Sequence, residues 1–194
     1  MIDILTQFDK SSNTIDYSLE KTEFLNISKH RDVWDISSIS NIFGYIIVNK
    51  YLKILGNDEN FGIKWANGIY EKYYDANSLL VAYDIFGGLF VIKDYHSGGE
   101  QIWYFAPDTM NWENLKITYH NFVKWICTDE FSLFYSDFPI EYVINNSIQI
   151  EEDGVLLIYP YLWSKEYKIA TPTINVVPFR ELFELNRDMY IQLN

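Results

Sequence analysis

The chain has 194 residues, of which 48% are hydrophobic and 22% charged, a composition that excludes disordered, low-complexity and fibrous proteins. Its 27 acidic side chains outnumber the 15 basic ones, and the formal charge of −12 argues against nucleic-acid binding, which requires clustered Lys and Arg. Folding a chain of this length buries roughly 70% of its extended surface, enough for one substantial core. Because the chain contains no linker-like stretch and no internal repeat, we predict a single domain over residues 1–194.

Three features bear on the compartment of the protein. Cys127 is the only cysteine, so neither an intrachain disulfide nor a Cys-based zinc site can form. The N-terminus carries Asp3 and no basic residue before Lys10, unlike the positive start of a secretory signal. The longest apolar run, Gly154–Trp163, has about half the length of a membrane-spanning helix. We therefore predict a cytoplasmic protein that does not engage a membrane.

The first strong structural signal along the chain is Phe43–Gly56, where two β-rich runs flank Asn49 and Lys50. Asn tolerates the left-handed backbone of a tight turn, so this segment predicts a β-hairpin. Before it, a short helix is expected near Ile2–Phe8. After it, residues 59–77 are expected to form a loop with at most one or two helical turns.

The densest β signal follows, with three strands expected at Leu79–Tyr83, Leu89–Ile92 and Gln101–Ala106. The turns that separate them, at 84–88 and 94–100, are too short to hold a crossover helix. This excludes a parallel, doubly wound sheet. We predict an α+β fold with a mainly antiparallel, twisted sheet and helices packed beside it.

The apolar period becomes helical after Thr118, which suits an N-cap. Four apolar residues then recur on one helical face: Tyr119, Phe122, Val123 and Ile126. A second helical stretch is expected over Glu130–Phe138 and a buried strand over Val155–Tyr159. The final helix is expected over Phe179–Leu193, directly after a proline.

Four segments resemble the bacterial domain-of-unknown-function family 2625: NKYLKILG, LLVAYDIFGGLFVIKD, QIWYFAPDTMNWENLKITYHNFVKWI and LLIYPYLWSKE. The most specific pieces are Asp-x-x-Gly-Gly-x-Phe at 84–90 and Phe-Ala-Pro-Asp-Thr at 105–109. The resemblance implies a fold. It implies no catalytic residues, because that family has no established activity.

The chain is also distantly similar to the SUKH superfamily, many of whose members are immunity proteins against secreted bacterial toxins. The shared outline is a strand pair around Gly-Gly, a Trp-Tyr-Phe strand and a helix that starts like Thr-Tyr-His-Asn-Phe. The Gly-x-x-Leu-Pro stretch of that superfamily is missing, since no Leu-Pro pair occurs in the chain. The likeness implies a role in binding a toxin.

No residue pattern indicates catalysis. Asp94 and His96, with Glu100 nearby, form at most half of a zinc site, and they lie in a Gly-Gly turn where polar residues are normally solvated. Cys127 falls at the C-terminal end of its expected helix, where the helix dipole favours the neutral thiol. We predict no catalytic residue, no cofactor and no metal site, which favours a binding protein over an enzyme.

The leading hypothesis is a non-enzymatic, immunity-like protein that binds a basic protein such as a toxin. Residues 126–194 carry eleven acidic side chains against four basic ones, which suits such a partner. Half-exposed aromatic rings suit protein recognition, whereas helices on both faces of the sheet would place every ring in the core. The residues expected at the interface are Trp103, Tyr104, Asp108, Trp112, Glu151, Glu152 and Asp153.

Two alternatives stay open. One is a small-molecule-binding domain or an enzyme with a cleft near Asp84, His96 and Asp108. The other is a structural or oligomer-forming protein. A deep pocket with convergent ionisable groups would favour the first of these.

Overall fold

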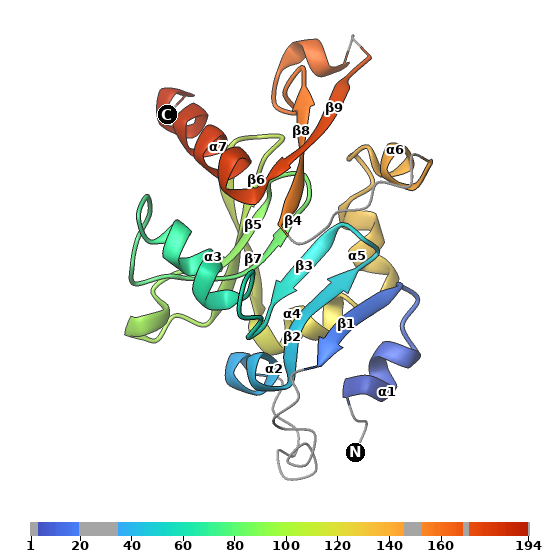
Figure 1. Cartoon of the computed structure of the whole chain (residues 1–194), viewed down its shortest axis with the longest axis vertical. Helices are drawn as coiled ribbons and strands as arrows, with labels where there is room; N and C mark the ends of the chain where they lie inside the picture. The colour runs from blue at the N-terminus through green and yellow to red at the C-terminus, as the bar shows by residue number, and fades with distance from the viewer. Residues whose placement is uncertain (1–3, 20–34, 146–152, 169–170, 194) are drawn as a thin grey trace.

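The protein, shown in Figure 1 as a computed structural model, is described over residues 4–19, 35–145, 153–168 and 171–193. Seven antiparallel strands form the main sheet, and each pairs with the next one along the chain. They are β1 (Ile15–Leu19), β2 (Phe43–Val48), β3 (Leu52–Leu55), β4 (Leu79–Asp84), β5 (Leu89–Ile92), β6 (Gln101–Ala106) and β7 (Asn111–Thr118). The predicted antiparallel α+β fold is confirmed.

A separate hairpin projects beyond the main sheet at the top of Figure 1. It consists of β8 (Gly154–Tyr159) and β9 (Thr173–Pro178), with a short 3-10 helix, η2 (Lys165–Lys168), between them. The backbone N–H of Leu156 donates to the carbonyl of Ile85 at 2.6 Å, which ties the hairpin to the β4–β5 turn.

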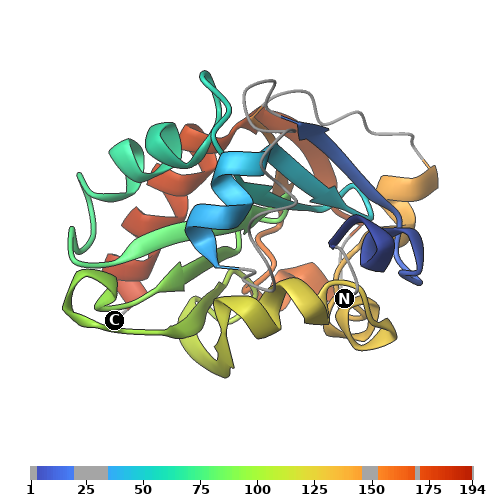
Figure 2. The ribbon, with the colours of Figure 1, turned by 90° about the horizontal axis from the view of Figure 1, so that it is seen from below.

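Helices cover both faces of the sheet (Figure 2). One face carries α1 (Ile4–Asp9), α2 (Ile36–Ile42), α4 (Tyr119–Trp125), α5 (Asp129–Phe134) and α6 (Ile140–Asn145). The other face carries α3 (Ile63–Tyr70) and α7 (Phe179–Leu193). Each face therefore has its own hydrophobic core, with the sheet as a shared wall.

Alternation along β5 and β6 fills both cores. On β6, Ile102 and Tyr104 enter the core under α4, whereas Phe105 enters the core under α7, as the alternation predicted. All four residues of β5 are buried. An antiparallel strand covered on both faces has no position left for a polar residue, which explains the unbroken apolar runs in the sequence.

The local predictions hold where backbone chemistry is specific. Asn49 and Lys50 have φ angles of 50° and 65°, as the tight turn between β2 and β3 requires. Thr118 caps α4 by accepting a hydrogen bond from the backbone N–H of Asn121 at 3.4 Å. The second predicted helix is shorter than expected, because α5 ends at Phe134 and the chain then turns.

Three strands were not predicted, and all three lie at sheet edges. β1 and β7 are the two ends of the main sheet, and β9 pairs only with β8. On β7 the positive φ of Lys116, 57°, interrupts the alternation between Leu115 and Ile117. Edge strands are half-exposed and carry many polar residues, so their hydrophobic pattern is weak.

Candidate functional site

Asp84 is the one charged side chain that is fully buried among the described residues. Its Oδ1 accepts hydrogen bonds from the backbone N–H groups of Phe86 at 2.9 Å and Gly88 at 2.8 Å. Its Oδ2 accepts from the hydroxyls of Tyr104 at 2.9 Å and Tyr135 at 3.2 Å. These four donors match the acceptor capacity of a carboxylate, so the group joins the β4–β5 turn to β6 and to the end of α5.

The electrostatics of Asp84 follow from its burial. Desolvation raises the pKa of its carboxyl from the ordinary 3.8 to about 6, although the four hydrogen bonds act in the opposite direction. Burial and the neighbouring carboxylate raise the pKa values of Tyr104 and Tyr135 well above 10.0, so both rings keep their protons and donate. A carboxylate enclosed in this way connects elements of the fold and presents no surface to solvent.

The same turn explains the Asp-x-x-Gly-Gly-x-Phe motif at 84–90. Gly87 has a φ of +94°, which glycine adopts without strain. At Gly88 a Cβ atom would overlap the Asp84 carboxylate and the Tyr104 ring. Phe90 then packs on the Tyr104 ring, with 4.7 Å between ring centroids. The motif therefore encodes a structural turn.

Two of the expected interface residues, Trp103 and Trp112, lie together. Both rings are half-buried and flank the Lys93 ammonium, whose Nζ lies 4.1 Å from the Trp103 centroid and 4.6 Å from that of Trp112. Tyr104 is only 2% exposed and points into the opposite core, so it is not part of this surface. Asp108 is exposed in the turn between β6 and β7.

Three acidic residues before the β8–β9 hairpin were expected at the interface, and the structure describes only one of them, Asp153. Glu151 and Glu152 lie outside the described residues. Asp153 is half-buried, and its carbonyl accepts a hydrogen bond from the Phe179 N–H at the start of α7. Nearer the tip, Tyr159 is 64% exposed, so the hairpin presents an aromatic ring to solvent.

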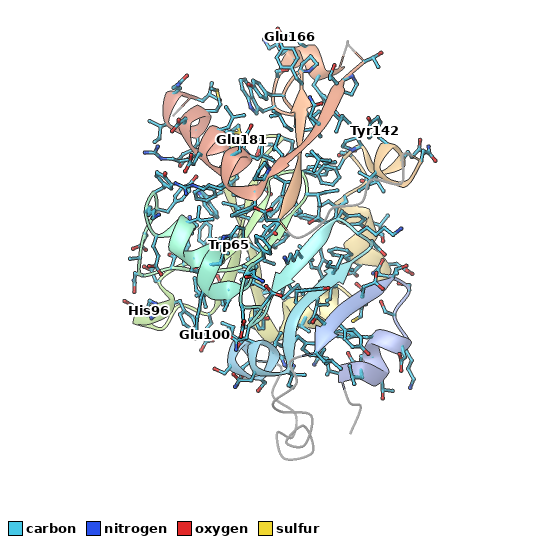
Figure 3. All side chains as sticks on the ribbon, in the orientation of Figure 1. Trp65, His96, Glu100, Tyr142, Glu166 and Glu181 are labelled. Atoms are coloured by element: carbon cyan, nitrogen blue, oxygen red, sulfur yellow. The ribbon has the colours of Figure 1, made fainter. Side chains whose placement is uncertain are left out.

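Asp84, His96 and Asp108, which the alternative hypothesis placed around one ligand-binding cleft, do not lie close together in the structure. His96 lies in the 3-10 helix η1 (Tyr95–Ser97), before β6, and Asp108 follows the other end of β6, so about 20 Å of strand separates their turns. Asp84 is enclosed, whereas His96 lies at the edge of the molecule in Figure 3. Over the part of the chain that the structure describes, no three His, Cys, Asp or Glu side chains gather as metal ligands.

Cys127 packs as a structural residue, as predicted from its place after α4. Burial raises the pKa of its thiol to about 11. The thiol donates a hydrogen bond to the carbonyl oxygen of Val123, 3.7 Å from Sγ. The neutral thiol is a poor nucleophile.

The surface of α5 and α6 was missed by the sequence interpretation. Residues 128–145, here called the acidic surface, contain four carboxylates and no Lys, Arg or His: Asp129, Glu130, Asp137 and Glu141. All four are exposed and form no ion pair within the described chain. Leu133 is 69% exposed and Tyr142 37%, and Tyr142 is labelled on α6 in Figure 3. The uninterrupted negative charge was visible in the sequence, but the exposure of the apolar residues was not.

Comparison with known proteins assigns the chain to a protein family. The model described as "Protein of unknown function DUF2625" matches residues 39–182, from α2 to α7. The chain belongs to this family. It is 26% identical over 152 residues to "Putative uncharacterized protein YbfG" of Escherichia coli K12, covering 75% of this chain and 68% of that protein. It is 27% identical over 164 residues to an uncharacterized protein of Haemophilus influenzae Rd, covering 78% of this chain and 67% of the relative.

The DUF2625 match covers six of the seven strands of the main sheet, β2 to β7, and includes the Asp84 turn. The family assignment thus confirms the resemblance carried by the Asp-x-x-Gly-Gly-x-Phe motif. No helix of the described residues is both long and apolar enough to cross a bilayer.

The first prediction tests the packing of the Asp84 turn. Gly88→Ala places a methyl group against two fixed side chains, so we expect the free energy of unfolding to fall by about 1–3 kcal/mol. Gly68→Ala, in α3, meets no atom within 4 Å and should raise that free energy by about 0.5–1 kcal/mol. Urea unfolding of both variants makes the comparison, and equal effects at the two glycines would contradict this packing.

The second prediction uses the titration of Asp84. The folded pKa of about 6 exceeds the ordinary 3.8, so the stability that proton binding contributes is complete below the lower value and lost as the pH rises through the upper one. Asp84→Asn removes this titration. We expect the free energy of unfolding of the wild type, relative to that of Asp84→Asn, to fall by roughly 2–3 kcal/mol between pH 4 and pH 7. Urea unfolding across this range measures it, and a difference independent of pH would contradict the burial of an ionised Asp84.

Proposed function

We propose that this protein is a non-enzymatic, cytoplasmic binding protein that recognises a basic protein partner. The observation that carries the proposal is the acidic surface, residues 128–145, where four exposed carboxylates form no ion pair within the described residues and the same segment exposes Leu133 and Tyr142. Unpaired charge steers an oppositely charged partner, and the apolar side chains between the charges supply area that is buried on contact.

The distant likeness to SUKH proteins supports a toxin as the basic partner, in an immunity role. A toxin-binding protein must capture its target before damage occurs, which favours fast association. Complementary charge raises association rates more than it raises affinity. The excess of carboxylates over cations fits this requirement.

Further surfaces belong to the same proposal. The pair Trp103 and Trp112, exposed Asp108, and the carboxylates of Glu151, Glu152 and Asp153 are the interface residues expected from the sequence. Trp side chains at half-exposed positions lengthen residence time, because their large rings are desolvated on binding. Charge and aromatic area would thus act on different rate constants.

The third prediction tests the acidic surface with the partner recovered from the native organism. We expect its association to slow at least tenfold between 50 and 300 mM salt, because exposed charges are screened beyond about 10 Å at 0.1 M salt. A variant with all four carboxylates neutralised (D129N, E130Q, D137N and E141Q) should associate about tenfold more slowly at low salt, with little change in dissociation. Surface biosensor kinetics measure both rates.

The matched control removes four exposed carboxylates elsewhere: D16N, E71Q, E100Q and E113Q. It changes the net charge equally, so a local effect of the acidic surface leaves its association rate close to that of the wild type. An acidic partner, or equal slowing in both variants, would overturn a specific role for residues 128–145. Substituting Glu151, Glu152 and Asp153 by the corresponding amides tests the hairpin base in the same assay.

A further inference from the structure

A cleft of about 770 Å³ opens between three segments of the chain that are distant in sequence. Its walls come from the α1–β1 connection at Ser12–Thr14, the β2–β3 turn at Asn49–Tyr51, and α5 with the start of α6 at residues 132–143. The volume lies within the range of small-molecule sites in proteins, which is roughly 300–1,000 Å³. Neither the Trp103 and Trp112 pair nor the hairpin contributes to it.

One wall of the cleft is a fixed network of neutral polar side chains. Asn13 Oδ1 accepts hydrogen bonds from Asn49 Nδ2 and from Ser132 Oγ, both at 2.7 Å. Asn13 Nδ2 in turn donates to the carbonyls of Ile126 at 2.9 Å and Thr128 at 2.8 Å. Because Asn13 is buried and held from both sides, the wall is ordered before any ligand arrives, which lowers the entropic cost of binding.

Other polar groups of the cleft have no hydrogen-bond partner among the side chains that the structure describes. The hydroxyls of Ser12, Thr14 and Ser136 are exposed and make no side-chain hydrogen bond within the described residues. A hydroxyl both donates and accepts, so three of them around one cavity suit a ligand that also carries groups of both kinds. Ligand hydroxyls have this property, whereas carboxylates and phosphates only accept.

The charges of the cleft do not favour a ligand of either sign. Lys50 and Glu141 are the only charged residues among its described lining, so their charges cancel. An anion would also have to approach a chain with a formal charge of −12. The apolar part of the lining that is partly exposed comes from Phe138, Pro139 and Ile140. Behind it, the buried rings of Tyr51 and Tyr135 pack with 4.7 Å between centroids, and Phe138 lies 5.5 Å from Tyr135. The C–H face of a sugar ring packs against such apolar surface while its hydroxyls remain bonded.

We propose that this cleft binds a neutral, hydroxyl-rich small molecule of mono- or disaccharide size. The Asn13, Asn49 and Ser132 network keeps this wall of the cleft rigid, and the hydroxyls of Ser12, Thr14 and Ser136 form hydrogen bonds with the ligand. This binding site goes beyond the proposed recognition of a basic protein and does not depend on it.

The fourth prediction is tested by NMR titration of the ¹⁵N-labelled chain with neutral monosaccharides and disaccharides, using glucose 6-phosphate and glycine as charged comparators. We expect saturable shifts of amides in residues 12–14, 49–51 and 132–136 with at least one neutral sugar. Ser136→Trp, which fills the cleft, should weaken that binding at least tenfold. Ser37→Trp, at an exposed serine of α2 outside the cleft, is the matched control and should leave it unchanged.

Ser136→Ala removes one free hydroxyl without filling the cleft, and should weaken binding about fivefold even where the tryptophan variant folds poorly. Thermal unfolding of each variant separates lost binding from lost fold. The proposal is overturned where no neutral sugar binds at 10 mM, where a charged comparator binds more tightly, or where the shifts lie outside the three segments.

Discussion

The structure depends most on a single buried carboxylate. Asp84 receives two backbone N–H groups from its own turn and two phenol hydroxyls from distant elements. Removing an ionised carboxylate from water is costly, and here no cation offsets that cost among the groups that shift its pKa. The four hydrogen bonds offset the cost of dehydrating the carboxylate only when all four donors are bonded to it. The carboxylate therefore requires one relative arrangement of the β4–β5 turn, β6 and α5.

Tyr135 transmits this constraint to the molecular surface. Its hydroxyl is bound to Asp84, while its ring packs against Tyr51 and Phe131, which fixes α5 over the β2–β3 turn. Tyr51 and Tyr135 are also among the residues that line the cleft, so the same contact supports its wall. The buried anchor therefore positions both the cleft and the acidic surface without touching a ligand itself.

The sequence predicted the parts of the fold that rest on local chemistry. The turn at Asn49 and Lys50 and the capping of α4 by Thr118 follow from residue type, and the strands of the central sheet follow from apolar runs separated by short turns. It did not predict β7, because an edge strand with polar residues and a left-handed Lys116 has no clear period. One alternative hypothesis from the sequence placed Asp84 at a ligand-binding cleft. The sequence does not reveal that Tyr135, fifty-one positions away, covers this carboxylate and hydrogen-bonds to it.

The candidate site was harder to predict than the fold for a related reason. The cleft combines short segments around positions 13, 49 and 135, and none of them has a pattern that marks a site alone. Trp103 and Trp112 lie together because β6 and β7 are adjacent strands, although β7 itself was not predicted, while Tyr104 lies on the opposite face by alternation along β6. Sites built across a fold become visible only when long-range contacts are known.

The positions of the charged side chains indicate which of them stabilise the fold and which are available to bind a partner. The described chain contains two ion pairs, Arg180 with Glu184 and Arg187 with Asp188, both at the surface of α7, where such pairs contribute little stability. The cores are held by apolar packing, and only Asp84 brings a carboxylate inside. Other carboxylates stabilise caps and turns, as Asp35, Asp58 and Asp75 do by accepting hydrogen bonds from backbone N–H groups. The four carboxylates of residues 128–145 form no ion pair within the described residues, and the same segment exposes Leu133 and Tyr142, a combination that solubility alone does not require.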